Sequence, residues 1–146
     1  MEKEWHEYLK QQFILEDKDL RTYSPLTLAY IGDGIYELLV RTVLISRGNA
    51  PVAKLHRKAS AVVKAGAQAA VIEFLVEQEL LTEEEYTIYK RGRNAYSPTR
   101  AKNASMSEYR KATGFEALAG YLYLKGDMQR LIDLVKMGLE GTGRYI

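Results

Sequence analysis

The sequence predicts an all-α protein, and two observations support that fold class. Apolar residues recur at the three- and four-residue spacing of a helix face in several segments, whereas no segment shows the alternation of a half-buried strand. Between these segments stand residues that start and stop helices, namely Ser or Thr caps, first-position prolines and terminal glycines. We therefore expect a helical bundle that forms one domain over residues 1–146, with residues 1–20 as an N-terminal helical extension.

The first half of the chain contains two helical regions after that extension. A Ser-Pro pair begins a helix over residues 25–46, because Ser is a good N-cap and Pro fits the first helical position, and Gly48 then ends it. A second helical region opens at Pro51 and continues over about residues 65–81.

Two capping boxes organise the second half of the chain. In such a box a Ser or Thr at the N-cap is followed three residues later by Glu. The first box begins a short helix over about 83–91, and the second, at 105–108, begins a helix that ends near Gly126. Turn-forming residues without periodicity predict a loop over 92–105, and a last helix covers about 127–139.

Composition excludes several classes of protein. With 47% hydrophobic and 27% charged residues the chain is typical of a globular domain. The absence of cysteine excludes a disulfide framework and a thiolate zinc site. The N-terminal segment is acidic and lacks the apolar stretch of a secretory signal, and no apolar run is long enough to span a bilayer. We expect a cytoplasmic protein with no membrane partner.

Charge is unevenly distributed although the net charge is only +2. Residues 38–72 carry six basic side chains and no acid, whereas residues 90–111 carry seven basic side chains and one acid. The acids concentrate in residues 1–19 and 73–85. Such asymmetry predicts a cationic surface and a polyanionic partner.

Two carboxylates lie in otherwise apolar helical segments. Asp33 stands between Gly32 and Gly34, and Glu116 stands one turn before Gly120. A buried acid costs several kcal/mol unless it is paired, protonated or bound to a metal. Glycine inside a helix costs about 1 kcal/mol, and close helix contact would offset that cost. From spacing alone, a metal-binding pair and a set of solvated surface acids both stay open.

The available ligands indicate which metal such a pair would bind. There is no cysteine, and the two histidines, His6 and His56, lie far apart in the sequence. Oxygen ligands favour a hard cation, and magnesium accepts one or two carboxylates while it keeps several waters. A magnesium ion held in this way can activate water for attack on a phosphodiester.

These same residues resemble a known family. The Leu-Ala-Tyr-Ile-Gly-Asp segment at 28–33 resembles the signature helix of the ribonuclease III endonuclease domain, and Phe-Glu-Ala-Leu-Ala-Gly at 115–120 resembles its second catalytic helix. The resemblance is closest to Mini-ribonuclease III, the form without a double-stranded-RNA-binding domain. Further similar stretches make the resemblance collinear over about residues 25–125; they are 33–41, 55–60, 90–95 and 121–124.

The resemblance implies a homodimeric, magnesium-dependent endoribonuclease of double-stranded RNA that leaves a 5′-phosphate and a 3′-hydroxyl. It assigns the metal-binding catalytic roles to Asp33 and Glu116, and it implies maturation of both ends of the 23S rRNA precursor as the activity. A ribosomal protein is a candidate partner for substrate delivery.

The chain departs from the wider family at three positions. Typical ribonuclease III carries acids at the positions of Leu26, Ala29 and Thr113, but the Mini form also tends to lack them. With fewer anionic ligands, we expect the enzyme to need more magnesium than an ordinary ribonuclease III.

The basic loop after residue 89 is the expected contact to the RNA backbone. Proteins recognise A-form RNA by its shape, phosphates and 2′-hydroxyls, because side chains do not fit its narrow major groove. The candidate RNA-binding residues are Lys90, Arg91, Arg93, Asn94, Arg100 and Lys102. A solvated basic loop is the alternative. For the whole chain, the alternatives are a non-catalytic double-stranded RNA-binding protein of the same fold and a helical dimerisation module.

Overall fold

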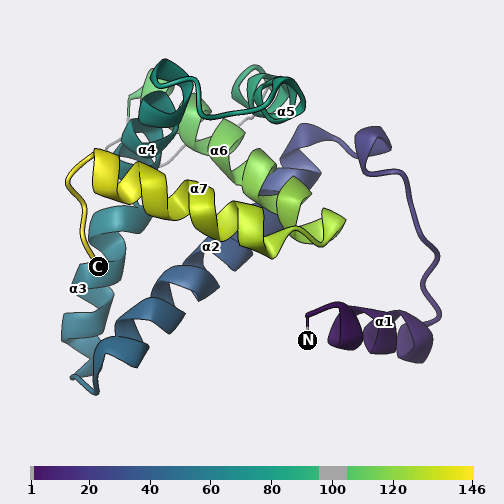
Figure 1. Cartoon of the computed structure of the whole chain (residues 1–146), viewed down its shortest axis with the longest axis horizontal. Coiled ribbons are helices and arrows are strands. Elements are labelled where there is room, and N and C mark those ends of the chain that lie inside the picture. The colour runs from purple at the N-terminus through teal and green to yellow at the C-terminus, as the bar shows by residue number, and fades with distance from the viewer. Residues whose placement is uncertain (1, 96–104) are drawn as a thin grey trace.

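The computed structural model describes residues 2–95 and 105–146, and within those ranges it contains helices and no strands, which confirms the all-α fold class (Figure 1). The helices in chain order are α1 (Glu2–Phe13), the short 3-10 helix η1 (Leu20–Thr22), α2 (Pro25–Arg47), α3 (Val52–Val63), α4 (Ala65–Glu77), α5 (Glu83–Arg93), α6 (Met106–Lys125) and α7 (Met128–Gly141).

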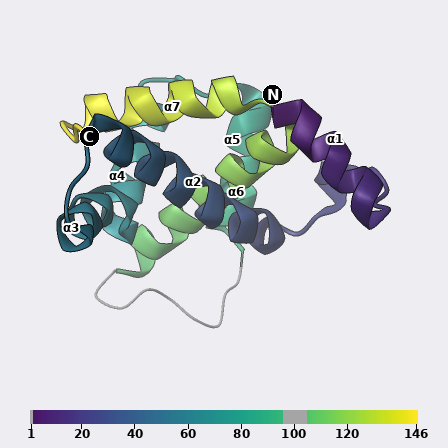
Figure 2. The ribbon, with the colours of Figure 1, turned by 90° about the horizontal axis from the view of Figure 1, so that it is seen from below.

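Helices α2 and α6 form the centre of the molecule. They make the most extensive contact between any two elements, and α4 and α5 pack against α6 while α3 packs against α2. Helix α7 covers one side of the bundle, as the view from below shows (Figure 2). The ring of Tyr36 on α2 meets that of Phe115 on α6 edge to face at 5.1 Å, and both side chains are fully buried. The core therefore fixes the relative position of the two helices that carry the candidate carboxylates.

The predicted helix starts are confirmed by their caps. The Ser24 hydroxyl accepts from the backbone N–H of Thr27, with Pro25 at the first helical position. Both predicted capping boxes are present, at the N-termini of α5 and α6. Gly126 caps α6 in the left-handed region, with φ of 87°, as its place after the last apolar position indicated.

Two predicted helices are shorter than expected. Helix α1 ends at Phe13 instead of continuing to residue 20, and α4 ends at Glu77 instead of about 81. Each stops where a non-glycine residue adopts the left-handed conformation, Ile14 and Glu79, both with φ of 54°. In each case the next residue donates its backbone N–H to a carbonyl five positions earlier and closes the helix end. Because neither end carries glycine, no residue type at these positions indicated a helix stop.

Helix α5 continues through Gly92 to Arg93, so the prediction of a loop from residue 92 is wrong at its start. A Cβ added to Gly92 would lie 2.8 Å from both the Cα of Gly114 and the Cβ of Ala117. The glycine therefore serves close packing of α5 on α6 and does not mark a turn.

Helices α3 and α4 meet at a 45° bend at Lys64, which has a ψ of 154° and belongs to neither helix. A helix end leaves its last carbonyls without partners in the helix. Here the Tyr36 hydroxyl donates to the Val62 carbonyl at 2.8 Å, and the Gln68 amide donates to the Val63 carbonyl at 2.6 Å. Side-chain hydrogen bonds from α2 and from α4 therefore stabilise the bend.

No single helix in the described ranges has the length and apolar character needed to cross a membrane. The bent pair α3–α4 meets that requirement only when its two halves are counted together.

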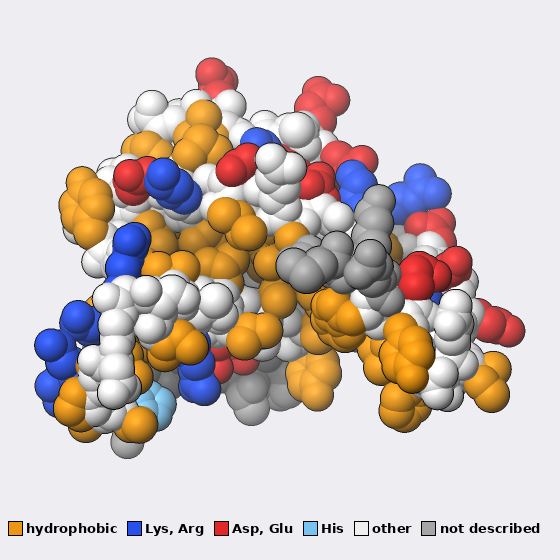
Figure 3. Space-filling view, turned by 60° about the horizontal axis from the view of Figure 1, so that its bottom comes forward, with side chains coloured by type: hydrophobic (Ala, Val, Ile, Leu, Met, Phe, Trp, Pro, Cys, Tyr) orange, Lys and Arg blue, Asp and Glu red, His pale blue; other side chains and the backbone are white. Residues whose placement is uncertain are grey.

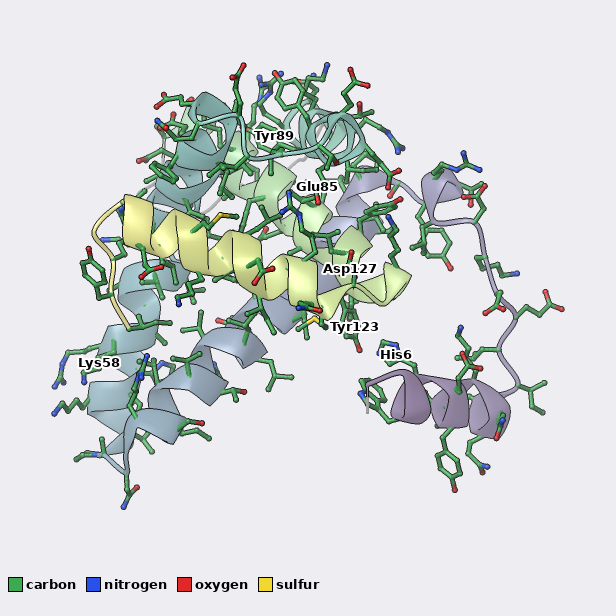
Figure 4. The ribbon with its side chains drawn as sticks, in the orientation of Figure 1. His6, Lys58, Glu85, Tyr89, Tyr123 and Asp127 are labelled. Carbon is green, nitrogen blue, oxygen red and sulfur yellow. The ribbon has the colours of Figure 1, made fainter. Side chains whose placement is uncertain are left out.

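Helix α1 lies beside the end of α6. His6 Nε2 is 2.8 Å from the hydroxyl of Tyr123, and the two labelled side chains face one another in Figure 4. Much of the apolar side of α1 stays exposed, including Trp5, Tyr8 and Phe13. The predicted amphipathic helix is confirmed as a helix, and its apolar stripe is only partly covered in the single chain.

Candidate active site

Two glycines bring the backbones of α2 and α6 into contact where the helices cross. A Cβ added to Gly32 would lie 1.7 Å from the carbonyl oxygen of Glu116, and one added to Gly120 would lie 2.0 Å from that of Leu28. The prediction that glycines beside the carboxylates serve helix contact is confirmed for these two positions. It is wrong for Gly34, because a Cβ added there would have no described atom within 4 Å other than those of its chain neighbours and its own helix backbone.

This crossing brings Asp33 and Glu116 together. The side chain of Glu116 is half-buried, whereas Asp33 is exposed. Burial is the largest cause that raises the pKa of Glu116 to about 8, and the negative charge of the nearby Asp33 carboxylate is the next. Glu37, one turn after Asp33, adds a smaller repulsion, and Arg41 lies 3.8 Å from the Glu37 carboxylate. The two residues named from the sequence are therefore neighbours in space.

Gln68 on α4 completes the surroundings of Glu116. Its Nε2 donates to Glu116 Oε2 at 3.3 Å as well as to the Val63 carbonyl at 2.6 Å, and the residue is only 2% exposed. Its Oε1 is buried and accepts no hydrogen bond from any described residue. A buried polar atom without a partner costs about 1–3 kcal/mol. The sequence analysis missed Gln68, although a single amide within the apolar run of α4 was a signal that could have identified it.

The carboxylate pair suits a hard divalent cation. A cation between Asp33 and Glu116 would remove the like-charge repulsion that helps to raise the pKa of Glu116. Within the described ranges no three or more His, Asp or Glu side chains gather into a metal-binding group. The protein would thus supply two carboxylates and leave the other coordination positions to water and substrate oxygens, an arrangement that magnesium accepts.

The three positions at which typical ribonuclease III carries additional acids contribute no acidic ligand. Ala29 is buried, and Leu26 is partly exposed at the start of α2. The hydroxyl of Thr113 donates to the Tyr109 carbonyl within α6, so it is bonded inside its own helix. These positions are filled by apolar groups or by a side chain with a local hydrogen bond.

Four of the predicted RNA-binding residues, Lys90, Arg91, Arg93 and Asn94, fall at the C-terminal end of α5, which packs on α6. Gly92 in that turn packs on Ala117, the neighbour of Glu116. Lys90 lies over the Tyr86 ring and Arg93 over the Tyr89 ring, at 4.8 and 5.5 Å from the ring centres. The remaining residues of the set are placed as follows: Arg91 is half-buried with Nη2 3.4 Å from the Tyr23 carbonyl, Asn94 is exposed, and Arg100 and Lys102 lie outside the described residues.

A second group of cations lies on α3. Its exposed members Lys54, Arg57 and Lys58 gather with others at the end of the molecule formed by α3, where Figure 3 shows many Lys and Arg side chains. The label in Figure 4 shows Lys58 pointing away from the bundle. A cavity of about 190 Å³ lies between α2 and α3 and is lined by Glu37, Arg41, His56, Ala59, Ser60, Val63 and Lys64. Its charged lining residues are Glu37, one turn after Asp33, and the cations Arg41 and Lys64.

Comparisons of sequence and structure match this chain to known proteins. The ribonuclease III domain family matches residues 26–127. A protein named Mini-ribonuclease 3 from Enterococcus faecalis is 46% identical over 126 residues, which are 86% of this chain and 96% of that protein. A protein of the same name from Clostridium tetani is 46% identical over 133 residues, which are 88% of this chain and 87% of that one. A crystal structure of a Fusobacterium nucleatum protein is 30% identical with a TM-score of 0.75, and the match covers 86% of this chain and 98% of that one.

Proposed function

Because the chain belongs to the ribonuclease III family, we propose that it is a magnesium-dependent endoribonuclease that cleaves double-stranded RNA and matures both ends of the 23S rRNA precursor. The observation that carries the proposal is the pairing of Asp33 with a half-buried Glu116 at the contact of α2 and α6. Ribonucleases of this family use a divalent cation, and the two-carboxylate arrangement favours magnesium as that cation.

The chemistry follows from what the two carboxylates can hold. A bound cation would activate a water and offset the charge that develops on the phosphodiester. Asp33 and Glu116 would hold that cation through their carboxylate oxygens, and the partial burial of Glu116 would limit access of bulk water to it. Attack of a water oxygen on phosphorus forms a new P–O bond and breaks the bond from phosphorus to the 3′ oxygen, which takes up a proton. Each cut thus divides one strand into a fragment that begins with a 5′-phosphate and a fragment that ends in a 3′-hydroxyl, the products that we propose.

Substrate binding is proposed for the cationic turn at the end of α5. Lys90 and Arg93 rest on the rings of Tyr86 and Tyr89, which hold these long side chains in place on α5. Phosphates of an A-form duplex are the groups that such cations contact. Lys90, Arg91, Arg93, Asn94, Arg100 and Lys102 together form the candidate RNA-binding set.

We propose that the enzyme acts as a homodimer in the cytoplasm. Members of this family often act as dimers, and a two-fold dimer matches the local two-fold symmetry of an RNA duplex, so that each site cleaves one strand. One side of α2 carries exposed apolar residues that a dimer would cover, including Tyr30 at 83% exposure and Leu38 and Ile45 at 60% each. A ribosomal protein that presents the precursor is proposed as a further partner.

The experiment that tests the proposal is cleavage of a 23S precursor stem with magnesium by the wild type and by the variants Asp33→Asn and Glu116→Gln. We expect cleavage by the wild type alone, with 5′-phosphate ends, and unchanged duplex binding by both variants. Duplex binding without cleavage by the wild type, with ribosomal proteins present, would instead favour the non-catalytic RNA-binding protein.

A further inference from the structure

We propose that Gln68 is a positioning residue of this active site, whose side-chain amide holds the Glu116 carboxylate in the orientation that binds the metal. The inference rests on the proposed function, because it takes Glu116 to be a metal ligand. It concerns a residue of α4, outside the two helices that carry the carboxylates.

The hydrogen bonds fix the direction in which the amide points. A primary amide has two N–H donors on nitrogen and only acceptor sites on oxygen. Both of the partners that it meets are acceptors, the Val63 carbonyl at 2.6 Å and Glu116 Oε2 at 3.3 Å. A reversed amide would place its oxygen against two other oxygens, so nitrogen must face them. Gln68 thus connects the Glu116 carboxylate to the main chain at the bend between α3 and α4.

The main-chain end of this connection is held in place. Val63 is the last residue of α3, and its carbonyl is one of those that the helix itself leaves without a partner. The neighbouring Val62 carbonyl accepts from the buried Tyr36 hydroxyl of α2. The bend is therefore anchored to the helix that carries Asp33, and Gln68 transmits that anchor to Glu116.

Packing alone does not account for an amide at this position. Gln68 is 2% exposed and stands among buried apolar residues of α4, including Ala67, Ala69 and Ile72. Its Oε1 accepts no hydrogen bond from any described residue. An apolar side chain of the same length would avoid that unsatisfied atom, and polar atoms that remain unsatisfied in native cores concentrate at functional sites. The position is thus better explained by its contact with Glu116.

The effect on catalysis would act through the geometry of the metal site. A metal-binding carboxylate is commonly oriented by a hydrogen-bond donor behind it, and loss of that donor typically lowers metal affinity or activity about 10- to 100-fold. The contact is made to Oε2 of Glu116, so the Nε2–H bond limits rotation of the carboxylate about its last torsion. RNA affinity should be unaffected, because Gln68 is buried and cannot touch a duplex.

The test compares Gln68→Met, which keeps the length of the side chain and removes its donors, with the control Leu75→Met at a fully buried position of the same helix. Binding of Mn²⁺ to the RNA-free protein is measured from the electron paramagnetic resonance signal of the free ion, and duplex affinity is measured in EDTA. For Gln68→Met we expect Mn²⁺ affinity and the single-turnover rate to fall about 10-fold or more, with duplex affinity within about twofold. For Leu75→Met we expect no change in any of the three.

A second comparison separates positioning from support of the bend. In a Glu116→Gln background, Gln68→Met should not weaken Mn²⁺ binding further, because the residue through which Gln68 acts is already altered. A further loss of the same size in that background would overturn the proposal, and so would an unchanged Mn²⁺ affinity in the single variant. Should Gln68→Met fail to fold, Gln68→Asn retains an amide that is too short to reach both acceptors, and full Mn²⁺ affinity in that variant would overturn the proposal.

The Mn²⁺ measurement also separates this proposal from the proposed function. If the wild type binds Mn²⁺ with the expected dependence on Gln68 but cleaves no RNA, the positioning role stands and the nuclease assignment fails.

Discussion

Replacement of Glu116 by Gln should make the metal-free protein more stable while it abolishes cleavage. Burial, followed by the charge of Asp33, raises the pKa of Glu116 from 4.5 to about 8. The folded protein therefore holds this proton more tightly than the unfolded chain does. Stability is unaffected by this group below pH 4.5, falls as the pH rises toward 8, and stays reduced above it. Gln carries no charge at any of these pH values and can still accept the hydrogen bond from Gln68.

The size of the effect follows from the same pKa. A tenfold change in an ionisation constant corresponds to about 1.4 kcal/mol, so the ionised Glu116 should lower the free energy of unfolding by about 3–5 kcal/mol at alkaline pH. For a chain of this size, about 1 kcal/mol shifts Tm by roughly 3 °C. Glu116→Gln should thus raise Tm by roughly 10 °C near pH 8.5, and by much less near pH 5.

The assay is thermal unfolding in EDTA across that pH range, with Glu140→Gln, an exposed residue near the end of α7, as the control. Addition of magnesium should stabilise the wild type and not Glu116→Gln, because a ligand that binds the native state stabilises it. A difference in Tm between wild type and Glu116→Gln that does not widen as the pH rises would refute the reasoning.

Three other perturbations have defined outcomes. Gly32→Ala should lower the free energy of unfolding in urea by at least about 3 kcal/mol, because its Cβ would overlap the Glu116 carbonyl. Gly34→Ala should raise the same free energy by up to about 1 kcal/mol, and equal effects of the two substitutions would contradict the helix contact. Glu85→Ala should cost about 3 kcal/mol or more at neutral pH by leaving its partner Arg130 without a carboxylate. Although burial alone would raise the pKa of Glu85, hydrogen bonds from Arg130 and Thr82 outweigh it and lower that pKa, so the cost measured by unfolding should shrink as the pH falls below 4.5. Joint replacement of Lys90 and Arg93 by Ala should remove about two phosphate contacts and so flatten the plot of log binding constant for the duplex against log salt concentration. An unchanged slope of that plot would exclude the α5 turn as a contact to the RNA backbone.

Local signals predicted much of the fold because several helix ends carry side-chain caps or glycine. The Ser24 cap, the two capping boxes and Gly126 each act within about one helical turn. They are found at the helix ends that the sequence predicts. The ends at Ile14 and Glu79 were missed because their left-handed conformations are stabilised by backbone hydrogen bonds, for which no residue type is diagnostic.

The candidate site was predictable to the extent that its residues are unusual for a helix. An acid in an apolar helical segment, next to glycine for Asp33 and one turn before glycine for Glu116, marked the two candidates, and close helix contact correctly accounts for Gly32. Gly34 has the same neighbour and makes no such contact, since it lies on the open side of α2. The difference between the two glycines depends on which face of α2 meets α6. The contact of Gln68 with Glu116 depends on the position of a third helix, α4. Both are properties of tertiary packing.

Because α2 and α6 touch through their main chains, the spacing of the two carboxylates depends little on which side chains fill the hydrophobic core. That spacing depends on backbone atoms at Gly32 and Gly120, whereas most of the stability comes from side chains such as Tyr36 and Phe115. Volume-conserving exchanges in a core usually cost less than about 1.5 kcal/mol each. A redesign for heat tolerance could therefore alter most apolar positions and keep the nuclease geometry, provided that the two glycines stay. A single methyl group at either glycine would separate the helices in an otherwise well-packed protein.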